Sequence, residues 1–199
     1  MAPEDEIVDV VDENDHVVGR APRGEVYARG LRHRAAFVLA RDARDRLFVH
    51  RRTATKLIFP SLYDVFVGGV LGAGESYDDG ALREAEEELG VTGLPRPTPL
   101  FRFLYDAPEG RGSWWSAVYE VRCTLPVNPQ AEEVAWHGFL PAGEVAARLR
   151  GEVPAGGAGE ALPWEFVPDG RVAYERYARH ARERPAADGT GGATGAGRA

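Results

Sequence analysis

Three glutamates on one predicted helix have the spacing of a metal-binding group. Glu84, Glu87 and Glu88 stand at positions i, i+3 and i+4, which places them within an arc of about 100° on one helix face. In a cleft of effective dielectric about 20, carboxylates about 5.5 Å apart repel by about 3 kcal/mol per pair. Oxygen ligands of this kind select Mg²⁺ or Mn²⁺, which commonly link carboxylates to phosphates. The alternative is a solvated acidic face, where each like-charge pair costs only roughly tenths of a kcal/mol.

The helix that carries these acids is predicted over residues 77–89. Ser76 can cap its first turn with a side-chain oxygen, and Gly90 stands where a helix commonly ends in the left-handed conformation. Three apolar residues share the face opposite the acids and should pack on a sheet. They are Leu82, Ala85 and Leu89. Glu86 lies on neither face and is predicted to be solvated.

A wider motif surrounds the glutamates. Residues 69–91 fit the pattern G-x5-E-x7-R-E-U-x-E-E-x-G-U, in which U is apolar, at every fixed position. The fixed positions are Gly69, Glu75, Arg83, Glu84, Glu87, Glu88 and Gly90. With each residue type at about 6–7% usage, seven matches arise by chance in about one window in 10⁸. The segment resembles the Nudix box, and the flanking strands are compatible with the Nudix α/β/α sandwich over roughly residues 5–180.

This resemblance implies a metal-dependent hydrolase that cleaves a diphosphate linkage by attack of water at phosphorus. The implied ligands of Mg²⁺ or Mn²⁺ are the carboxylates of Glu84, Glu87 and Glu88 and the carbonyl of Gly68. The same glutamates are the implied catalytic residues, and Glu84 or a nearby acid would also act as base. Arg83 joins this catalytic set because its ion pair with Glu75 would fix the carboxylates. A nucleoside di- or triphosphate is the expected substrate.

Charged residues outside the box are candidates for further roles. Glu133 precedes a predicted strand and is the expected additional base, since the resemblance implies a base from a loop outside the box. Arg51, Arg52 and Lys56 lie near the strand before the box and are candidates to bind the phosphates of the substrate. Arginine suits bidentate contact with phosphate. Solvated loop or surface charge is the alternative for all four residues.

One Nudix subgroup, close in sequence to isopentenyl-diphosphate isomerase, has flanks that resemble LRHRAAFVLA and HRRTATKLIFPSLYDV in this chain. That isomerase requires a cysteine acid/base and a histidine metal site. Here Gly68 stands at the place of the cysteine and Val70 at that of a ligand histidine, while His33 alone keeps its register. A proton shuttle that lacks both partners does not run, so an isomerase is a minor alternative and His33 is predicted to be structural. A Nudix module that binds a nucleotide or metabolite without turnover is the other alternative, disfavoured because every box acid is present.

Composition and charge limit the classes of partner. The chain has 199 residues and a net charge of −7, which argues against binding to nucleic acid polymers or to anionic membranes. Cys123 is its one cysteine, so no intrachain disulfide can form. The first residues lack the basic start and apolar run of a signal peptide, and no stretch is apolar enough for a membrane helix. A cytoplasmic protein that acts on a small molecule is expected.

The remaining pattern predicts one Nudix domain over residues 1–183 and a disordered tail at 184–199, which has no large apolar side chain to bury. A β-hairpin is predicted at residues 6–20, followed by a polar segment near Gly24–Gly30. The predicted strands span residues 33–40, 47–52, 62–71, 98–106, 113–124 and 134–140. The predicted helices span residues 77–89, 141–150 and 169–184, with a mobile loop at 151–163. This is an α/β fold with a mixed sheet flanked by helices, and the hairpin and the aromatic strand at 113–124 could form a homodimer.

Overall fold

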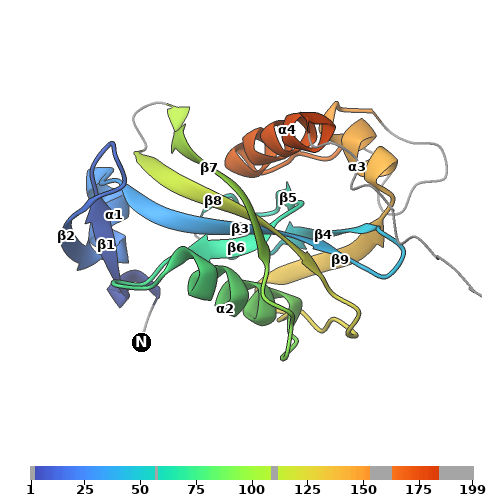
Figure 1. The fold of residues 1–199 in the computed structure, drawn as a ribbon, viewed down its shortest axis with the longest axis horizontal. Helices are drawn as coiled ribbons and strands as arrows, with labels where there is room; N and C mark the ends of the chain where they lie inside the picture. The colour runs from blue at the N-terminus through green and yellow to red at the C-terminus, as the bar shows by residue number, and fades with distance from the viewer. Residues whose placement is uncertain (1–2, 57, 109–111, 153–162, 184–199) are drawn as a thin grey trace, which may run out of the picture.

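Seven strands form one mixed sheet at the centre of the molecule (Figure 1). They are β3 (His33–Arg41), β4 (Leu47–Arg52), β5 (Tyr63–Asp64), β6 (Val67–Val70), β7 (Thr98–Asp106), β8 (Ser113–Arg122) and β9 (Val134–Leu140). Their order is β5-β4-β3-β8-β7, with β6 also paired to β3 and β9 to β4. β3 and β8 run parallel, and the other pairs are antiparallel. The predicted α/β class with a mixed sheet is confirmed.

The computed structural model describes residues 3–56, 58–108, 112–152 and 163–183. The predicted tail at 184–199 and most of the predicted loop at 151–163 lie outside these residues. No helix within the described ranges is both long and apolar enough to cross a membrane.

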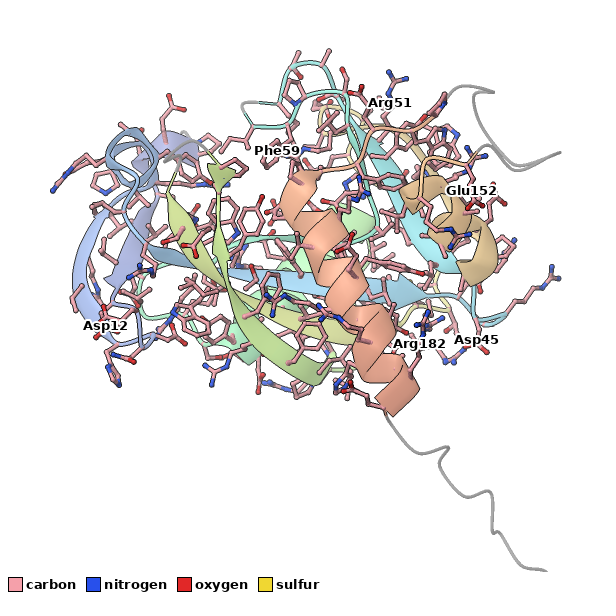
Figure 2. The ribbon with its side chains drawn as sticks, turned by 90° about the horizontal axis from the view of Figure 1, so that it is seen from above. Asp12, Asp45, Arg51, Phe59, Glu152 and Arg182 are labelled. Carbon is pink, nitrogen blue, oxygen red and sulfur yellow. The ribbon has the colours of Figure 1, made fainter. Side chains whose placement is uncertain are left out.

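Helices cover both faces of the sheet (Figures 1 and 2). They are α2 (Tyr77–Leu89) on one face, and α3 (Ala142–Leu149) and α4 (Pro168–Glu183) on the other. The two faces follow from the alternation of side chains along β3. Val38 packs in the core cluster under α2, whereas its neighbour Leu39 packs in the cluster under α3 and α4. The sheet therefore separates two apolar cores, as in the predicted sandwich.

The N-terminal residues form a separate unit at one end of the sheet (Figure 1). Its elements are a 3-10 turn (Pro3–Asp5), β1 (Ile7–Val11), β2 (Val17–Pro22) and α1 (Arg23–Arg29). The predicted hairpin is confirmed, and it extends to Pro22. Helix α1 replaces the polar segment expected there. Because Val26 is its one fully buried residue, the helix is too short to show an apolar period in the sequence.

The strand predicted at 62–71 is wrong as a single element, because the chain changes partner within it. β5 pairs with β4, and β6 pairs with β3. Between the two strands, Asp64 Oδ1 accepts a hydrogen bond of 3.0 Å from the backbone N–H of Phe66. This local bond turns the chain. A continuous apolar run in the sequence does not show where a strand exchanges neighbours.

The aromatic strand β8 lies inside the sheet. β3 pairs with one of its edges and β7 with the other, and Trp114 stacks on His33 with ring centroids 5.6 Å apart. The strand therefore offers no free edge to a second copy of the chain. The hairpin does expose apolar side chains, namely Ile7, Val17 and Val18. Of the two elements predicted for a homodimer, the hairpin is the one that remains accessible.

A substitution at Gly90 tests how the C-terminal end of α2 is fixed. Its φ is +63°, and a Cβ there would lie 1.8 Å from the carbonyl oxygen of Asn128. We expect Gly90→Ala to lower the free energy of unfolding by about 2–5 kcal/mol, since the left-handed conformation costs about 1–2 kcal/mol and the clash about 1–3 kcal/mol. Gly93→Ala is the matched control, because Gly93 has φ +85° and a Cβ there would meet nothing within 4 Å. Urea unfolding measures both, and equal losses would contradict the steric role given to Asn128.

Candidate active site

Glu84 lies against the backbone of β6. A Cβ on Gly69 would lie 2.7 Å from each carboxylate oxygen of Glu84, so a larger residue at position 69 would displace the acid. The Glu84 residue is 9% exposed. The glycine that begins the box is therefore explained by the space that the first glutamate needs.

The side chain of Glu88 contacts strand β6 at Gly68, the residue before Gly69. Its Oε2 accepts a hydrogen bond of 3.0 Å from the backbone N–H of Gly68. A Cβ on Gly68 would lie 2.0 Å from the carbonyl oxygen of Ala36, so glycine is required here as well. In the structure, the contact between Gly68 and Glu88 is made by the backbone N–H of Gly68. The predicted role of its carbonyl as a metal ligand stays a prediction.

The box glutamates share one electrostatic environment. Burial raises the pKa of Glu84 to about 7, and the charge of Glu87 raises it further while Arg83 opposes the shift. Burial also raises the pKa of the partly buried Glu88 to about 8, and the charge of Glu84 adds to this effect. The pKa of each of these two acids therefore depends on the charge of a neighbouring glutamate. Such coupling favours the binding of a cation among them.

Arg83 holds the helix to the loop that precedes it. Its Nε and Nη2 donate to the two carboxylate oxygens of Glu75, at 2.7 and 2.9 Å. Its Nη1 donates to Glu84 Oε1 at 2.8 Å and lies 3.6 Å from Glu87 Oε2. The hydrogen bond from Arg83 is the main cause that lowers the pKa of Glu75. The structure thus contains the ion pair that the sequence predicted.

The donor set suits a hard divalent cation. Within the described residues, no three His, Cys, Asp or Glu side chains converge as closely as a bound metal ion requires. The positive charge beside Glu84 and Glu87 is instead that of Arg83. The available donors are nevertheless the carboxylate oxygens of Glu84 and Glu88. Burial and the charge of a neighbouring glutamate disfavour the ionised form of each acid. Mg²⁺ and Mn²⁺ prefer such oxygens and would relieve that repulsion.

Basic residues and one further acid gather on the Glu88 side of the site. Burial raises the pKa of Glu88, and the charges of Lys56 and Arg52 both oppose that shift. Lys56 Nζ pairs with Glu133 Oε1 at 3.0 Å, and Arg52 Nη2 donates to the carbonyl of Ile58 at 3.0 Å. The structure therefore brings together three of the residues that the sequence selected outside the box.

Arg51 lies apart from this group. Its Nε donates to the carbonyl of Ser61 at 3.1 Å, and its guanidinium carbon lies 5.7 Å from the ring centroid of Tyr63. Tyr63 belongs to the core under α3 and α4. Neighbouring residues of a strand point to opposite faces, so Arg51 and Arg52 of β4 diverge. The predicted role of Arg51 in substrate binding finds no support in this placement.

Two acids near Arg52 were not selected from the sequence. Burial raises the pKa of Asp64 to about 7, and the charge of Asp169 raises it further. Burial likewise raises the pKa of Asp169 to about 6. The charge of Arg52 opposes both shifts. The one signal in the sequence was an aspartate within an apolar strand segment, LYDVF.

Three other predicted side chains have structural partners. His33 is buried, its Nδ1 lies 3.2 Å from the carbonyl oxygen of Leu31, and burial lowers its pKa to about 4, which confirms the structural role. Cys123 is buried in the core under α2. Glu86, predicted to be solvated, is partly exposed, and its Oε1 also accepts a hydrogen bond of 2.9 Å from the N–H of Leu94.

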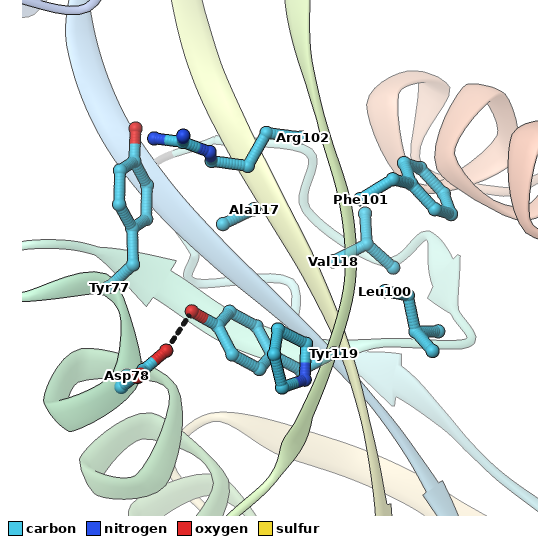
Figure 3. Close-up of a pocket in the computed structure, with 9 residues that line it drawn as sticks. Tyr77, Asp78, Leu100, Phe101, Arg102, Ala117, Val118 and Tyr119 are labelled. Atoms are coloured by element: carbon cyan, nitrogen blue, oxygen red, sulfur yellow. Dashed lines mark hydrogen bonds between the residues drawn. The ribbon is translucent and has the colours of Figure 1, made fainter.

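A cavity of ≈ 320 Å³ lies between the start of α2 and strands β7 and β8 (Figure 3). Its polar side chains are engaged with one another or with the hairpin. Tyr119 donates to Asp78 at 2.6 Å, and Arg102 pairs with Asp15 at 2.9 Å. None of the box glutamates lines this cavity.

Comparison with known proteins identifies the class. The family model described as NUDIX domain matches residues 31–164. The chain therefore belongs to the Nudix family, and it is a hydrolase that acts on phosphoric anhydrides.

Its relatives share both sequence and fold. The chain is 66% identical over 176 residues to the uncharacterized Nudix hydrolase SCO1686 of Streptomyces coelicolor, a match that covers 88% of this chain and 90% of that protein. The crystal structure of DR0079 from Deinococcus radiodurans has a TM-score of 0.66 and 28% identity, covering 86% of this chain and 99% of that one. The NUDIX domain of Shewanella oneidensis NrtR, solved with ADP ribose, has a TM-score of 0.53 and 16% identity, covering 76% and 87%, which shows a shared fold.

The raised pKa of Asp64 predicts a pH-dependent stability. An aspartate in the unfolded chain titrates near pH ~3.9, whereas folded Asp64 titrates at about 7. Between these values the unfolded state has released a proton that the folded state keeps, so stability falls as pH rises. We expect Asp64→Asn to gain roughly 2–4 kcal/mol relative to wild type between pH ~4 and pH ~7. Urea unfolding across this range measures the difference, and a pH-independent difference would contradict the assignment.

Proposed function

We propose that this Nudix hydrolase cleaves a diphosphate linkage of a small molecule by attack of water at phosphorus, with Mg²⁺ or Mn²⁺ as cofactor. Its candidate metal ligands are the carboxylates of Glu84, Glu87 and Glu88 and the carbonyl of Gly68. The observation that carries the proposal is a pair of acids, the buried Glu84 and the partly buried Glu88, held against the glycine backbone of β6.

The protein's own groups supply most of the required chemistry. Glu84 is the first candidate base, because a carboxylate beside the attacking water can accept its proton. A bound divalent cation would lower the pKa of that water and neutralise charge on the diphosphate. Arg52 and Lys56 can hold the phosphates, because a guanidinium and an ammonium both donate to phosphate oxygens. Glu133, paired with Lys56, is the second candidate base.

A nucleoside di- or triphosphate is the substrate we favour. The net charge of −7 opposes polyanionic polymers, and the two basic side chains of Arg52 and Lys56 suit a short phosphate chain. ADP-ribose belongs in the same substrate panel, since a domain of the same fold is bound to it. We place the enzyme in the cytoplasm as one domain over residues 1–183, with the hairpin as the candidate surface for a homodimer.

Substitution of the box acids tests the proposal. We expect Glu84→Gln and Glu88→Gln each to lower hydrolysis of the best substrate by at least about 10²-fold, the usual cost of removing a key catalytic group. Glu86→Gln is the matched control, because Glu86 lies on the same helix and bonds to the loop after it. The assay is phosphate or pyrophosphate release from a panel of diphosphate compounds with Mg²⁺ or Mn²⁺.

Three outcomes of this panel would change the conclusion. Activity equal to wild type in both glutamine variants would refute the site. Tight nucleotide binding without turnover by the wild type would favour a binding module. Formation of dimethylallyl diphosphate from isopentenyl diphosphate would favour an isomerase.

Substitution of the basic residues tests how the phosphates are held. We expect Arg52→Gln and Lys56→Gln to raise KM by about 10- to 100-fold, because a hydrogen bond to a charged group contributes about 1.5–3 kcal/mol. Arg44→Gln is the control, since Arg44 is an exposed residue in the turn between β3 and β4. Steady-state kinetics separates the parameters. An unchanged KM in both variants would remove Arg52 and Lys56 from the binding site.

A further inference from the structure

The N-terminal hairpin contacts the loop that leads into α2. Figure 1 shows the hairpin at the end of the sheet, next to this loop. Val8 forms an isolated bridge with Gly72, and the N–H of Ala73 donates to the carbonyl of Ile7 at 2.9 Å. The hairpin lies before residue 31, where the family match begins. The box loop is therefore held by an element from outside the matched domain.

Asp9 makes the first side-chain contact of the hairpin with this loop. It is 5% exposed, and its Oδ2 accepts a hydrogen bond of 2.8 Å from the N–H of Gly74. Its Oδ1 accepts one of 3.0 Å from Arg20 Nε. Both oxygens of a buried carboxylate are thus engaged. Removing the carboxylate would take from the Gly74 N–H its hydrogen bond to the hairpin and would leave Arg20 without its partner.

Asp15 makes the second contact, at the first residue of α2. Tyr77 donates to Asp15 Oδ1 at 3.1 Å. Two arginines bind the same carboxylate, Arg34 Nε at 2.6 Å and Arg102 Nη1 at 2.9 Å. Their guanidinium carbons also lie 5.4 and 5.3 Å from the ring centroid of Tyr77. The start of the helix is therefore fixed by charge from the hairpin turn.

The segment between these two contacts leads to the candidate metal ligands. The N–H of Gly72 donates to Glu75 Oε2 at 2.9 Å. Glu75 binds Arg83 through both oxygens, and Arg83 donates to Glu84. A displacement of residues 74–77 would reach Glu84 through these bonds.

We infer that Asp9 and Asp15 are positioning residues that clamp both ends of residues 74–77 and so orient Glu84 for metal binding. The inference rests on the proposed function of the box glutamates as ligands. Residues that orient metal ligands from behind commonly change metal affinity by about 10- to 100-fold when they are altered.

Metal affinity and loop protection together test the clamp. We expect Asp9→Ala and Asp15→Ala to weaken Mn²⁺ binding about 10-fold, measured without substrate by electron paramagnetic resonance of free Mn²⁺. In the metal-free proteins, amide hydrogen exchange of residues 72–77 should accelerate at least about 10-fold, while the amides of β3 keep their protection. Glu13→Gln is the matched control, an exposed acid in the same hairpin turn, and should match wild type in both measurements.

Asp9→Asn provides a second variant that keeps the shape of the side chain. Its single carbonyl oxygen can keep one of the two hydrogen bonds of Asp9, so a smaller loss in the same direction is expected even if Asp9→Ala fails to fold. Unchanged Mn²⁺ affinity and unchanged loop exchange in the folded variants would overturn the clamp. If wild type binds no Mn²⁺, the proposed function fails, and the exchange of the metal-free loop still decides for or against the clamp.

Discussion

The guanidinium of Arg83 joins the loop and the helix of the Nudix box. It donates to both oxygens of Glu75 and to one oxygen of Glu84, so one positive charge lies among several negative ones. Acids on adjacent helical turns repel one another and, without such a partner, would spread into solvent. Glu75 also accepts from the N–H of Gly72. The shape of the loop and the direction of Glu84 therefore depend on the same ion pair.

Several acids in this protein are kept where ionisation is unfavourable. Burial raises the pKa of Glu84 and Glu88 on one helix, and of Asp64 and Asp169 on two other elements. Such carboxylates reduce the stability of the fold at neutral pH, and strongly shifted groups gather at functional sites. Arg52, the last residue of β4, attracts Glu88 and both aspartates. The charge of one basic residue thus acts on acids of the box helix, of β5 and of α4.

The family fold supplies a scaffold to which the N-terminal unit adds contacts. The match to the NUDIX domain covers residues 31–164, and the hairpin packs against the box loop from outside that range. The relative from Streptomyces coelicolor aligns over 176 residues, a longer stretch than the domain match. Its similarity therefore extends beyond the common domain.

The helix that carries the glutamates was predictable because its causes are local. Ser76 caps the first turn through the N–H of Asp79, and Gly90 ends the helix with a positive φ. The spacing of Glu84, Glu87 and Glu88 then places their side chains on one face whatever surrounds them. The motif also selected Glu75 and Arg83, whose ion pair joins the residue before the N-cap of α2 to a residue on the same helix.

Tertiary structure alone decided which of the other charged residues meet. Arg52 approaches Glu88 while Arg51 turns toward Tyr63, because adjacent residues of β4 face opposite sides of the sheet. Asp64 and Asp169 are separated by about half of the chain and become neighbours only when α4 packs on the sheet. Local sequence determines helix limits and spacing, whereas contacts between distant segments depend on strand order, which no short pattern encodes.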